Sequence, residues 1–288
     1  MQKVGLICDM NFSRHPQFKS YFYAVEELLG RPVLITNKKQ LTDIDLLIVG
    51  DDHYDRHKEI FQAPGFIGVC NGLDIPVIVL TTERILNSYF PWNKTNLKVL
   101  KGVQNLFHHT ADCDDCEALG TTVHRISISS VFKDKYRTDK KKNGIVFIGS
   151  TQCKQGSYDA RRKLLEDLIK AGVKIDILDK GVPSWEDYIK TLAEYRFVLS
   201  PIGNGNFLTT RFYETLAVGS IPLQQVTDNM LTHYDIEGKF DDCIFFKTVD
   251  DLVAKLSLTT LQTSHNELWT EDNLKIIFKQ DNIKLWNE

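Results

Sequence analysis

Short, almost purely apolar runs alternate with segments of helical periodicity along the first half of the chain. Between two such runs, residues 18–29 carry apolar side chains at helical spacing and end at Gly30. Strands buried on both faces have this composition, and strands alternating with helices form parallel sheets. We therefore expect a doubly wound parallel α/β sheet. Its main strands are expected at 3–9, 32–35, 45–50 and 75–80.

The alternation restarts at Gly144 and continues to about residue 256. One expected helix begins after Ser184, which can cap it and is followed three residues later by Asp187. Two α/β units of similar size in one chain predict two Rossmann-like lobes. In the second lobe, strands are expected at 144–150, 173–178, 196–200, 221–223 and 243–246. Helices are expected there at 158–171, 185–194, 211–218 and 249–256.

A basic segment without apolar periodicity separates the two halves. It is expected to be an interdomain linker at 133–143, because a short charge run of this kind is usually a solvated surface. The tail at 263–288 has the pattern of one or two amphipathic helices. The predicted organisation is a first lobe at 1–132, the linker, a second lobe at 144–262 and the helical tail.

Composition indicates an ordinary globular protein. Of the 288 residues, 42% are hydrophobic and 25% are charged, and the formal net charge is −3. This balance gives no general attraction to nucleic acid or to anionic membranes. The longest apolar runs are strand-sized, and Met1-Gln2-Lys3 leads into one of them without a signal-peptide pattern. We expect a cytoplasmic protein without membrane insertion.

Cys113 and Cys116 form the only C-x-x-C pair among six cysteines. A structural zinc site needs a second pair at suitable spacing, and the sequence offers none, although His108 and His109 lie just upstream. The pair is therefore expected in a reduced surface loop, and no metal site is expected.

The segment 197–222 carries the clearest chemical signal. An apolar strand ends in a glycine-containing loop, which leads to the amino end of a helix bearing Arg211 and Glu214. Backbone N–H groups at a helix start and an arginine in its first turn suit a phosphate group. A carboxylate three residues later lies on the same helix face and can accept two hydrogen bonds from a ribose diol. The alternative is that Arg211 and Glu214 form an ordinary salt bridge on the helix surface.

Two patterns in this segment, S-P-x-G-x-G at 200–205 and R-x-x-E-x-L-A-x-G-x-I-P at 211–222, resemble the donor-site motif of exostosin-type and related GT-B glycosyltransferases. The resemblance implies two lobes with an interdomain cleft, the donor in the second lobe, and a C-terminal helix crossing back to the first. It also implies transfer of a hexose or pentose from a nucleotide-diphosphate sugar, with no required metal or other cofactor.

By the same resemblance, Arg211 would contact the diphosphate, Glu214 the ribose, the loop at 149–151 the phosphates, and the region after Asp179 the base. The full set of expected donor-binding residues is Gly149, Ser150, Asp179, Gly203, Gly205, Thr209, Thr210, Arg211 and Glu214.

Catalytic residues are expected at the carboxyl ends of the first-lobe strands, because ligands gather at that edge of a parallel sheet. An inverting transfer needs a base for the acceptor hydroxyl. Asp9, Asp51 and Glu83 are the candidates, and each could instead cap a helix or be solvated. A retaining enzyme would need no such base.

The acceptor hydroxyl is left open by the sequence. It could belong to a glycan, a protein, a small molecule or a hydroxymethylated base in DNA, as in some phage enzymes. The alternative function is a non-catalytic nucleotide-binding module. An NAD-linked oxidoreductase is disfavoured because no G-x-G-x-x-G follows the first strand.

Overall fold

The computed structural model describes part of the first half of the chain and most of the second. The described residues are 3–7, 25–26, 29–51, 66–81, 102–110, 112–119, 135–138, 140–151, 156–179, 182–203, 205–234, 240 and 243–258. The chain divides into two compact units, one of Met1–Ser127 with Trp269–Glu288 and the other of Ile128–Leu268. The predicted domain boundaries stay predictions.

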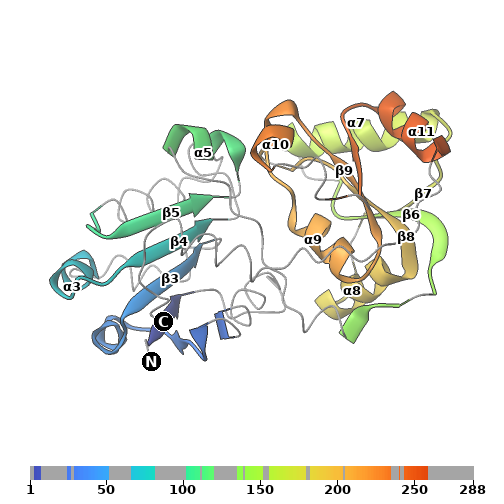
Figure 1. Ribbon diagram of the computed structural model, residues 1–288. Coiled ribbons are helices and arrows are strands. Elements are labelled where there is room, and N and C mark those ends of the chain that lie inside the picture. The colour runs from blue at the N-terminus through green and yellow to red at the C-terminus, as the bar shows by residue number, and fades with distance from the viewer. Residues whose placement is uncertain are drawn as a thin grey trace. The chain divides into compact units, whose positions relative to one another are not determined.

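The first unit contains a parallel sheet of five described strands in the order β2-β1-β3-β4-β5 (Figure 1). Its strands are β1 (Val4–Ile7), β2 (Val33–Leu34), β3 (Leu46–Asp51), β4 (Val77–Thr81) and β5 (Leu106–Thr110). Its described helices are the 3₁₀ helix η1 (Lys38–Asp43), α3 (Phe66–Gly72) and α5 (Cys113–Leu119). Each strand expected in this half at 3–9, 32–35, 45–50 and 75–80 is present.

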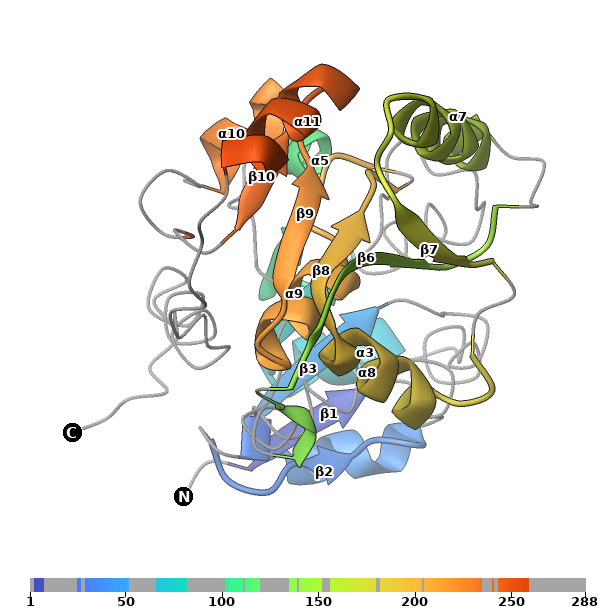
Figure 2. The same ribbon diagram turned by 90° about the vertical axis from the view of Figure 1, so that its right-hand side faces the viewer.

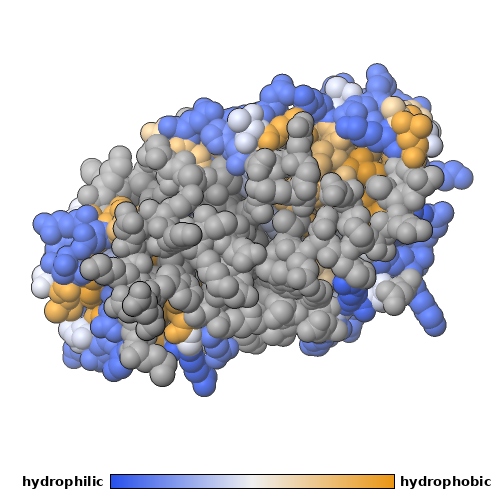
Figure 3. Space-filling model, in the orientation of Figure 1, coloured by the Kyte–Doolittle hydropathy of each residue, from blue (hydrophilic) through white to orange (hydrophobic). Residues whose placement is uncertain are grey.

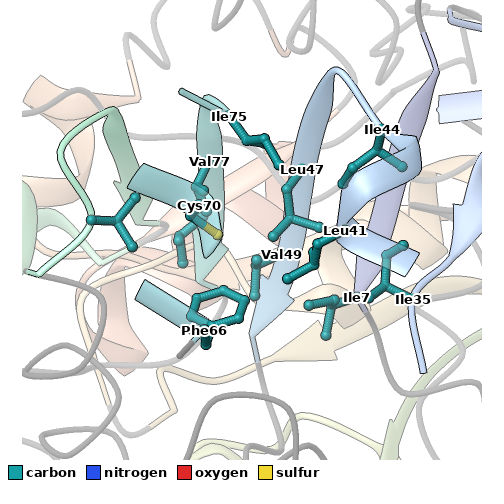
Figure 4. Close-up of a cluster of buried hydrophobic side chains, with 12 residues drawn as sticks. Ile7, Ile35, Leu41, Ile44, Leu47, Val49, Phe66, Cys70, Ile75 and Val77 are labelled. Atoms are coloured by element: carbon teal, nitrogen blue, oxygen red, sulfur yellow. The ribbon is translucent and has the colours of Figure 1, made fainter. Parts of the chain in front are cut away.

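Apolar side chains of the first sheet form a core with η1 and α3 (Figure 4). Val49 of β3 lies between Leu41 of η1 and Phe66 of α3, and every buried member of the cluster is at most 6% exposed. Burying a side chain of this size contributes about 1.5–3 kcal/mol. The alternate residues Leu46 and Ile48 are at most 1% exposed as well, so both faces of β3 are buried, which accounts for its nearly unbroken apolar run.

Cys113 and Cys116 lie in α5, so the expected surface loop is wrong. Asp112 caps this helix, accepting the backbone N–H of Asp115 at 3.0 Å. Residues three apart share a helix face, and here that face is the inner one, where both thiols are at most 1% exposed. The sequence pattern was too short to reveal a helix of this length.

The second unit contains a parallel sheet of five described strands in the order β10-β9-β8-β6-β7, seen side by side in Figure 2. Its strands are β6 (Lys142–Ile148), β7 (Ile175–Leu178), β8 (Tyr195–Ser200), β9 (Ile221–Gln225) and β10 (Ile244–Phe246). Its described helices are α7 (Gly156–Lys170), α8 (Trp185–Glu194), α9 (Thr210–Ala217), α10 (Asp228–His233) and α11 (Val249–Leu258). The sequence predicted all of these except the short α10.

Helices cover both faces of the second sheet. Leu165 of α7 and Leu252 of α11 join a buried cluster with Phe197 and Leu199 of β8. Helices α8 and α9 pack together and against β8 from the opposite face (Figure 1). Ser184 caps α8 by accepting the N–H of Asp187 at 3.1 Å, which confirms the predicted helix start.

Both sheets have the same internal strand order. When the strands of each sheet are numbered from 1 to 5 in chain order, both sheets have the order 2-1-3-4-5; in the second sheet, β6 is strand 1 and β10 is strand 5. The direction in which strands are added therefore reverses between the first and third strands. Ligands of doubly wound sheets bind outside the carboxyl ends of the strands at this reversal. The reversal lies between β1 and β3 in the first unit and between β6 and β8 in the second.

The described part of the predicted linker is mixed: Lys135, Lys140 and Lys142 are exposed, as expected of a solvated charge run, whereas Tyr136 and Lys141 pack into the second unit. Tyr136 is buried and meets the Trp185 ring edge-on, with centroids 5.9 Å apart. Lys141 Nζ donates to the carbonyl oxygens of Ala193 and Val218 and to Ser220 Oγ at 2.9–3.1 Å. Its cation thereby joins the carboxyl ends of α8 and α9, where positive charge is favourable.

No helix in the described ranges is both long enough and apolar enough to span a membrane. In the view of Figure 3, most of the surface of the described residues is hydrophilic, and smaller areas of hydrophobic residues lie among them. The tail at 263–288 lies outside the described residues, so its crossing helix stays a prediction, as does the interdomain cleft.

We predict that Lys141→Met lowers the free energy of unfolding by about 3 kcal/mol, because three oxygen acceptors lose a charged donor. Lys140→Met is the matched control: Lys140 is exposed and its recorded hydrogen bond uses only its backbone, so the expected change is within about 0.5 kcal/mol. Urea denaturation measures both. Equal effects of the two substitutions would show that Lys141 does not join α8 and α9.

Candidate functional site

The carboxyl ends of β6 and β8 form the candidate site of the second unit. β6 ends at Ile148 and continues into Gly149, and β8 ends at Ser200 and continues into the loop before α9. Because β6 and β8 are neighbours at the reversal of strand order, these two loops emerge side by side. Most of the predicted donor-binding residues lie in these loops or at the start of α9.

Gly149 requires glycine for two reasons. Its φ is +152°, which side chains other than hydrogen rarely permit. A Cβ at this position would also stand 3.0 Å from Arg211 Nη2 and 3.3 Å from Phe147 Cζ. The backbone of the β6 loop therefore runs directly against the guanidinium group of Arg211.

Arg211 points from α9 to the end of β6. Its Nη2 donates to the carbonyl oxygen of Ile148, and its guanidinium carbon lies 5.1 Å from the centroid of the Phe147 ring. Its Nε is buried and has no hydrogen-bond partner among the described residues. The structure thus brings Arg211 and Gly149 together, as the sequence predicted from separate segments, and leaves a buried donor on the arginine.

Arg161 of α7 supplies a second guanidinium group at Gly149. Its Nη1 would lie 3.9 Å from a Cβ on Gly149 and donates to the Ser150 carbonyl oxygen at 3.0 Å. Its guanidinium carbon also lies over Phe147, 5.8 Å from the ring centroid. Sequence reasoning missed Arg161, because the pair Arg161-Arg162 looks like the exposed face of a helix; its position soon after the β6 loop was the available signal.

The β6 loop is fixed by the end of β7. One carboxylate oxygen of Asp179 accepts both the backbone N–H and the hydroxyl of Thr151, and Gly149 N donates to Leu178 O at 3.2 Å. Arg162 donates to Thr151 O at 2.6 Å. Asp179 therefore holds the predicted phosphate loop in place, and its predicted proximity to the nucleotide base stays a prediction.

Glu214 lies on the inner face of α9 and is only 8% exposed. Its Oε2 accepts the hydroxyl of Tyr188 at 2.7 Å. Arg211 and Glu214 form no direct ion pair within the described structure. The alternative of a surface salt bridge is thus wrong, because both side chains face inward to different partners.

Burial dominates the electrostatics of this group. Desolvation raises the pKa of Glu214 above its ordinary value of 4.5, although hydrogen bonding and the charge of Arg211 oppose the shift. Desolvation also raises the pKa of Tyr188, with the Glu214 charge adding to it and Arg211 opposing it. Tyr188 was not identified from the sequence because it lies on another helix.

The remaining predicted donor residues lie along the loop from β8 to α9. Gly203 is half-buried with open space where a Cβ would stand, and Gly205 is buried. Thr209 is the N-cap of α9, but its side chain makes no capping hydrogen bond, and Thr210 begins the helix. The first N–H groups of α9 therefore have no side-chain cap from Thr209, and such groups suit an anion.

The predicted catalytic carboxylates belong to the first unit. Asp9 and Glu83 lie outside the described residues. Asp51 is the last residue of β3 and pairs in register with Thr81, which places it at the carboxyl edge of the sheet and on a strand next to the order reversal. The catalytic roles of all three stay predictions.

In the described ranges, no three His, Cys, Asp or Glu side chains gather as metal ligands could, and the expectation of no metal stays a prediction. This holds for Cys113 and Cys116 in α5 as well. Burial raises the pKa of the Cys113 thiol far above its usual range, and the nearby acidic groups add to the shift.

We predict that protonation of Glu214 makes stability depend on pH. Because its folded-state pKa is raised, the folded protein binds this proton more tightly than the unfolded chain does. The resulting stabilisation is complete below pH 4.5 and is lost as pH rises through the folded-state pKa. Wild type should therefore lose stability relative to Glu214→Gln between acidic and neutral pH. Urea denaturation across this range measures the free energy of unfolding of both proteins. If wild type keeps or gains stability relative to Glu214→Gln as pH rises, the folded-state pKa of Glu214 is not raised.

Comparison with known proteins identifies the fold and leaves the sequence family open. No family model matches the chain, and no curated protein matches it in sequence. Among solved structures, Anabaena Alr3699/HepE in complex with UDP-glucose matches with a TM-score of 0.53 and 9% identity, over 99% of this chain and 98% of that one. The same protein with UDP and glucose matches with a TM-score of 0.53 and 11% identity, over 97% and 95%.

An α1,3-fucosyltransferase structure also aligns over 100% of this chain and 92% of its own, with 10% identity and a TM-score of 0.47. At such low identity the likeness concerns the fold. The chain therefore has a two-unit α/β fold with two parallel sheets, of the kind found in HepE.

Proposed function

We propose that the protein is a glycosyltransferase that takes its sugar from a nucleotide-diphosphate donor bound at the Gly149 loop. The supporting fold is shared with HepE, whose crystal structures contain UDP or UDP-glucose. The supporting sequence signal is the donor-site pattern at 200–222. The shared fold and the sequence pattern do not by themselves identify a donor site, so the proposal also depends on the geometry of the second unit.

One observation carries the proposal: the guanidinium groups of Arg211 and Arg161 both lie against Gly149 at the reversal of strand order. Two cations placed this closely repel each other, and a bound dianion removes that repulsion. The buried Nε of Arg211 provides a donor that no described residue satisfies. A diphosphate supplies both the charge and the oxygen acceptors that such a pair requires.

The same arrangement suits the chemical step. When the bond between the sugar and the donor breaks, negative charge grows on the departing nucleoside diphosphate. Guanidinium groups already in position stabilise that charge without having to reorganise. The side chains of Phe147 and Thr151 keep the groups in place, one by stacking under Arg211 and the other by fixing the loop.

Other parts of the assignment are proposals from the sequence. The transferred sugar is a hexose or a pentose, and the acceptor hydroxyl belongs to a glycan, a protein, a small molecule or a hydroxymethylated DNA base. Asp9, Asp51 and Glu83 are the proposed bases for an inverting reaction. No metal or cofactor is proposed to take part.

We predict that UDP or UDP-glucose binds wild type, and that Arg211→Met and Arg161→Met each weaken binding about 10- to 100-fold, because each removes a charged hydrogen-bonding group. Isothermal titration calorimetry measures the affinities. Lys163→Met is the matched control: it also removes one positive charge from α7, but from an exposed site, and should change affinity less than about twofold. Circular dichroism confirms that each variant is folded.

Release of UDP from UDP-glucose tests the reaction itself. Steady release by wild type that is lost in Arg211→Met supports the enzyme, whereas binding without release by wild type would favour the non-catalytic module. If UDP-, GDP- and ADP-sugars all fail to bind, or if CMP-sugars with their single phosphate bind instead, the diphosphate assignment is wrong.

A further inference from the structure

One face of α7 turns toward the second sheet and carries a charge. The residues that follow one another along this face, at spacings of three or four, are Tyr158, Arg161, Leu165 and Leu168. Leu165 and Leu168 are at most 3% exposed and belong to the buried apolar cluster that includes Phe147 of β6. The face is therefore the inner one, and near the carboxyl end of β6 it presents a guanidinium group instead of another apolar side chain.

Two aromatic rings lie close to this guanidinium group. Its carbon atom is 4.8 Å from the centroid of the Tyr158 ring and 5.8 Å from that of the Phe147 ring. A ring attracts a cation within about 6 Å of its centroid through the negative potential of its π face. This attraction needs no N–H donor, and Arg161 Nη1 donates to Ser150 O at 3.0 Å. The rings therefore hold the group at the β6 loop without competing for its donors.

Arg162, the next residue, uses the same spacing in a different way. It forms an ion pair with Asp159, three residues earlier, whereas Arg161 has the ring of Tyr158 three residues earlier. A carboxylate offsets the positive charge of its partner, but a neutral ring leaves that charge in place. An aromatic ring is thus a partner that holds an arginine and keeps its charge for a ligand.

We infer that Tyr158 is a positioning residue, whose ring holds the guanidinium group of Arg161 at the Gly149 loop so that it can bind a diphosphate. This inference rests on the proposed function and adds a residue that lies outside the donor pattern at 200–222. Phe147 has a part in the same arrangement, because Arg211 also lies over its ring, at 5.1 Å. Tyr158 is the residue to test, because it is half-buried, whereas a substitution of the fully buried Phe147 would also disturb the core.

The first experiment compares the UDP affinities of Tyr158→Leu and Tyr158→Phe by isothermal titration calorimetry. Leucine removes the ring, and we expect UDP to bind about 3- to 10-fold more weakly, the usual effect of one cation–π contact at a partly buried site. Phenylalanine keeps the ring, so its affinity should stay within about 1.5-fold of wild type. Equal losses in the two variants, or no loss in Tyr158→Leu, would overturn the inference.

Tyr195→Leu is the matched control. It also removes a ring beside a cation, since Lys142 Nζ lies 5.0 Å from the centroid of the Tyr195 ring. Tyr195 and Lys142 begin β8 and β6, so this pair lies at the other end of these strands from the Gly149 loop. UDP affinity should therefore change less than about 1.5-fold, and circular dichroism confirms that each variant is folded. A loss as large as that in Tyr158→Leu would assign both effects to general packing and overturn the inference.

A double-mutant cycle identifies the group through which Tyr158 acts. In the Arg161→Met background, Tyr158→Leu is expected to cause no further loss of UDP affinity, because the guanidinium group that the ring holds is absent. A loss that adds in full would mean that Tyr158 contacts the nucleotide itself, and the positioning role would be wrong.

A measurement without nucleotide separates this inference from the proposed function. Protons that lie over an aromatic ring resonate upfield, so the NMR signals of the Arg161 δ-methylene group should be shifted in wild type. Arg161→Lys identifies these signals by their loss. Tyr158→Leu should move them toward their ordinary positions, and Tyr158→Phe should not. Failure of wild type to bind any nucleotide-diphosphate sugar would refute the proposed function, whereas Arg161 signals that stay unchanged in Tyr158→Leu would refute the positioning role.

Discussion

The position of one guanidinium group, that of Arg211, governs the organisation of the second unit's carboxyl edge. The group donates to the end of β6, stacks over Phe147 and lies 3.0 Å from where a Cβ on Gly149 would stand. Burying a cation at this depth is costly unless its donors find partners. The carbonyl oxygen of Ile148 supplies one of these partners, and a diphosphate would supply others. The end of β6, Gly149 and the start of α9 are thus arranged around the charge of Arg211.

The sequence predicted the strands well because strands buried on both faces are apolar along most of their length, and β4 shows this directly with Val77, Ile78, Val79 and Leu80 each at most 1% exposed. It also predicted the start of α8, because Ser184 and Asp187 form a cap that depends on neighbouring residues only. Short helices such as α5 and α10 were missed, since six or seven residues do not establish a helical period.

In the candidate site, too, the sequence predicted the residues that belong to local patterns and missed those that depend on packing. Gly149 and Arg211 were predicted from separate local patterns, and the structure brings them into contact. Arg161 and Tyr188 could not be predicted, because their part in the site depends on the packing of α7 and α8 and leaves no local pattern. The basic segment before β6 shows the opposite error: Lys141 reads as a solvated charge, yet it joins the ends of α8 and α9. Helix ends are where a buried lysine finds carbonyl acceptors, and sequence alone does not show which helices will end there.

The central claim is that Arg161 and Arg211 bind a diphosphate beside Gly149. A crystal structure of the protein grown with UDP tests it most directly. The account predicts phosphate oxygens within hydrogen-bond distance of both guanidinium groups, with the diphosphate lying along the β6 loop. Well-defined UDP bound elsewhere, with neither arginine in contact with a phosphate, would contradict it.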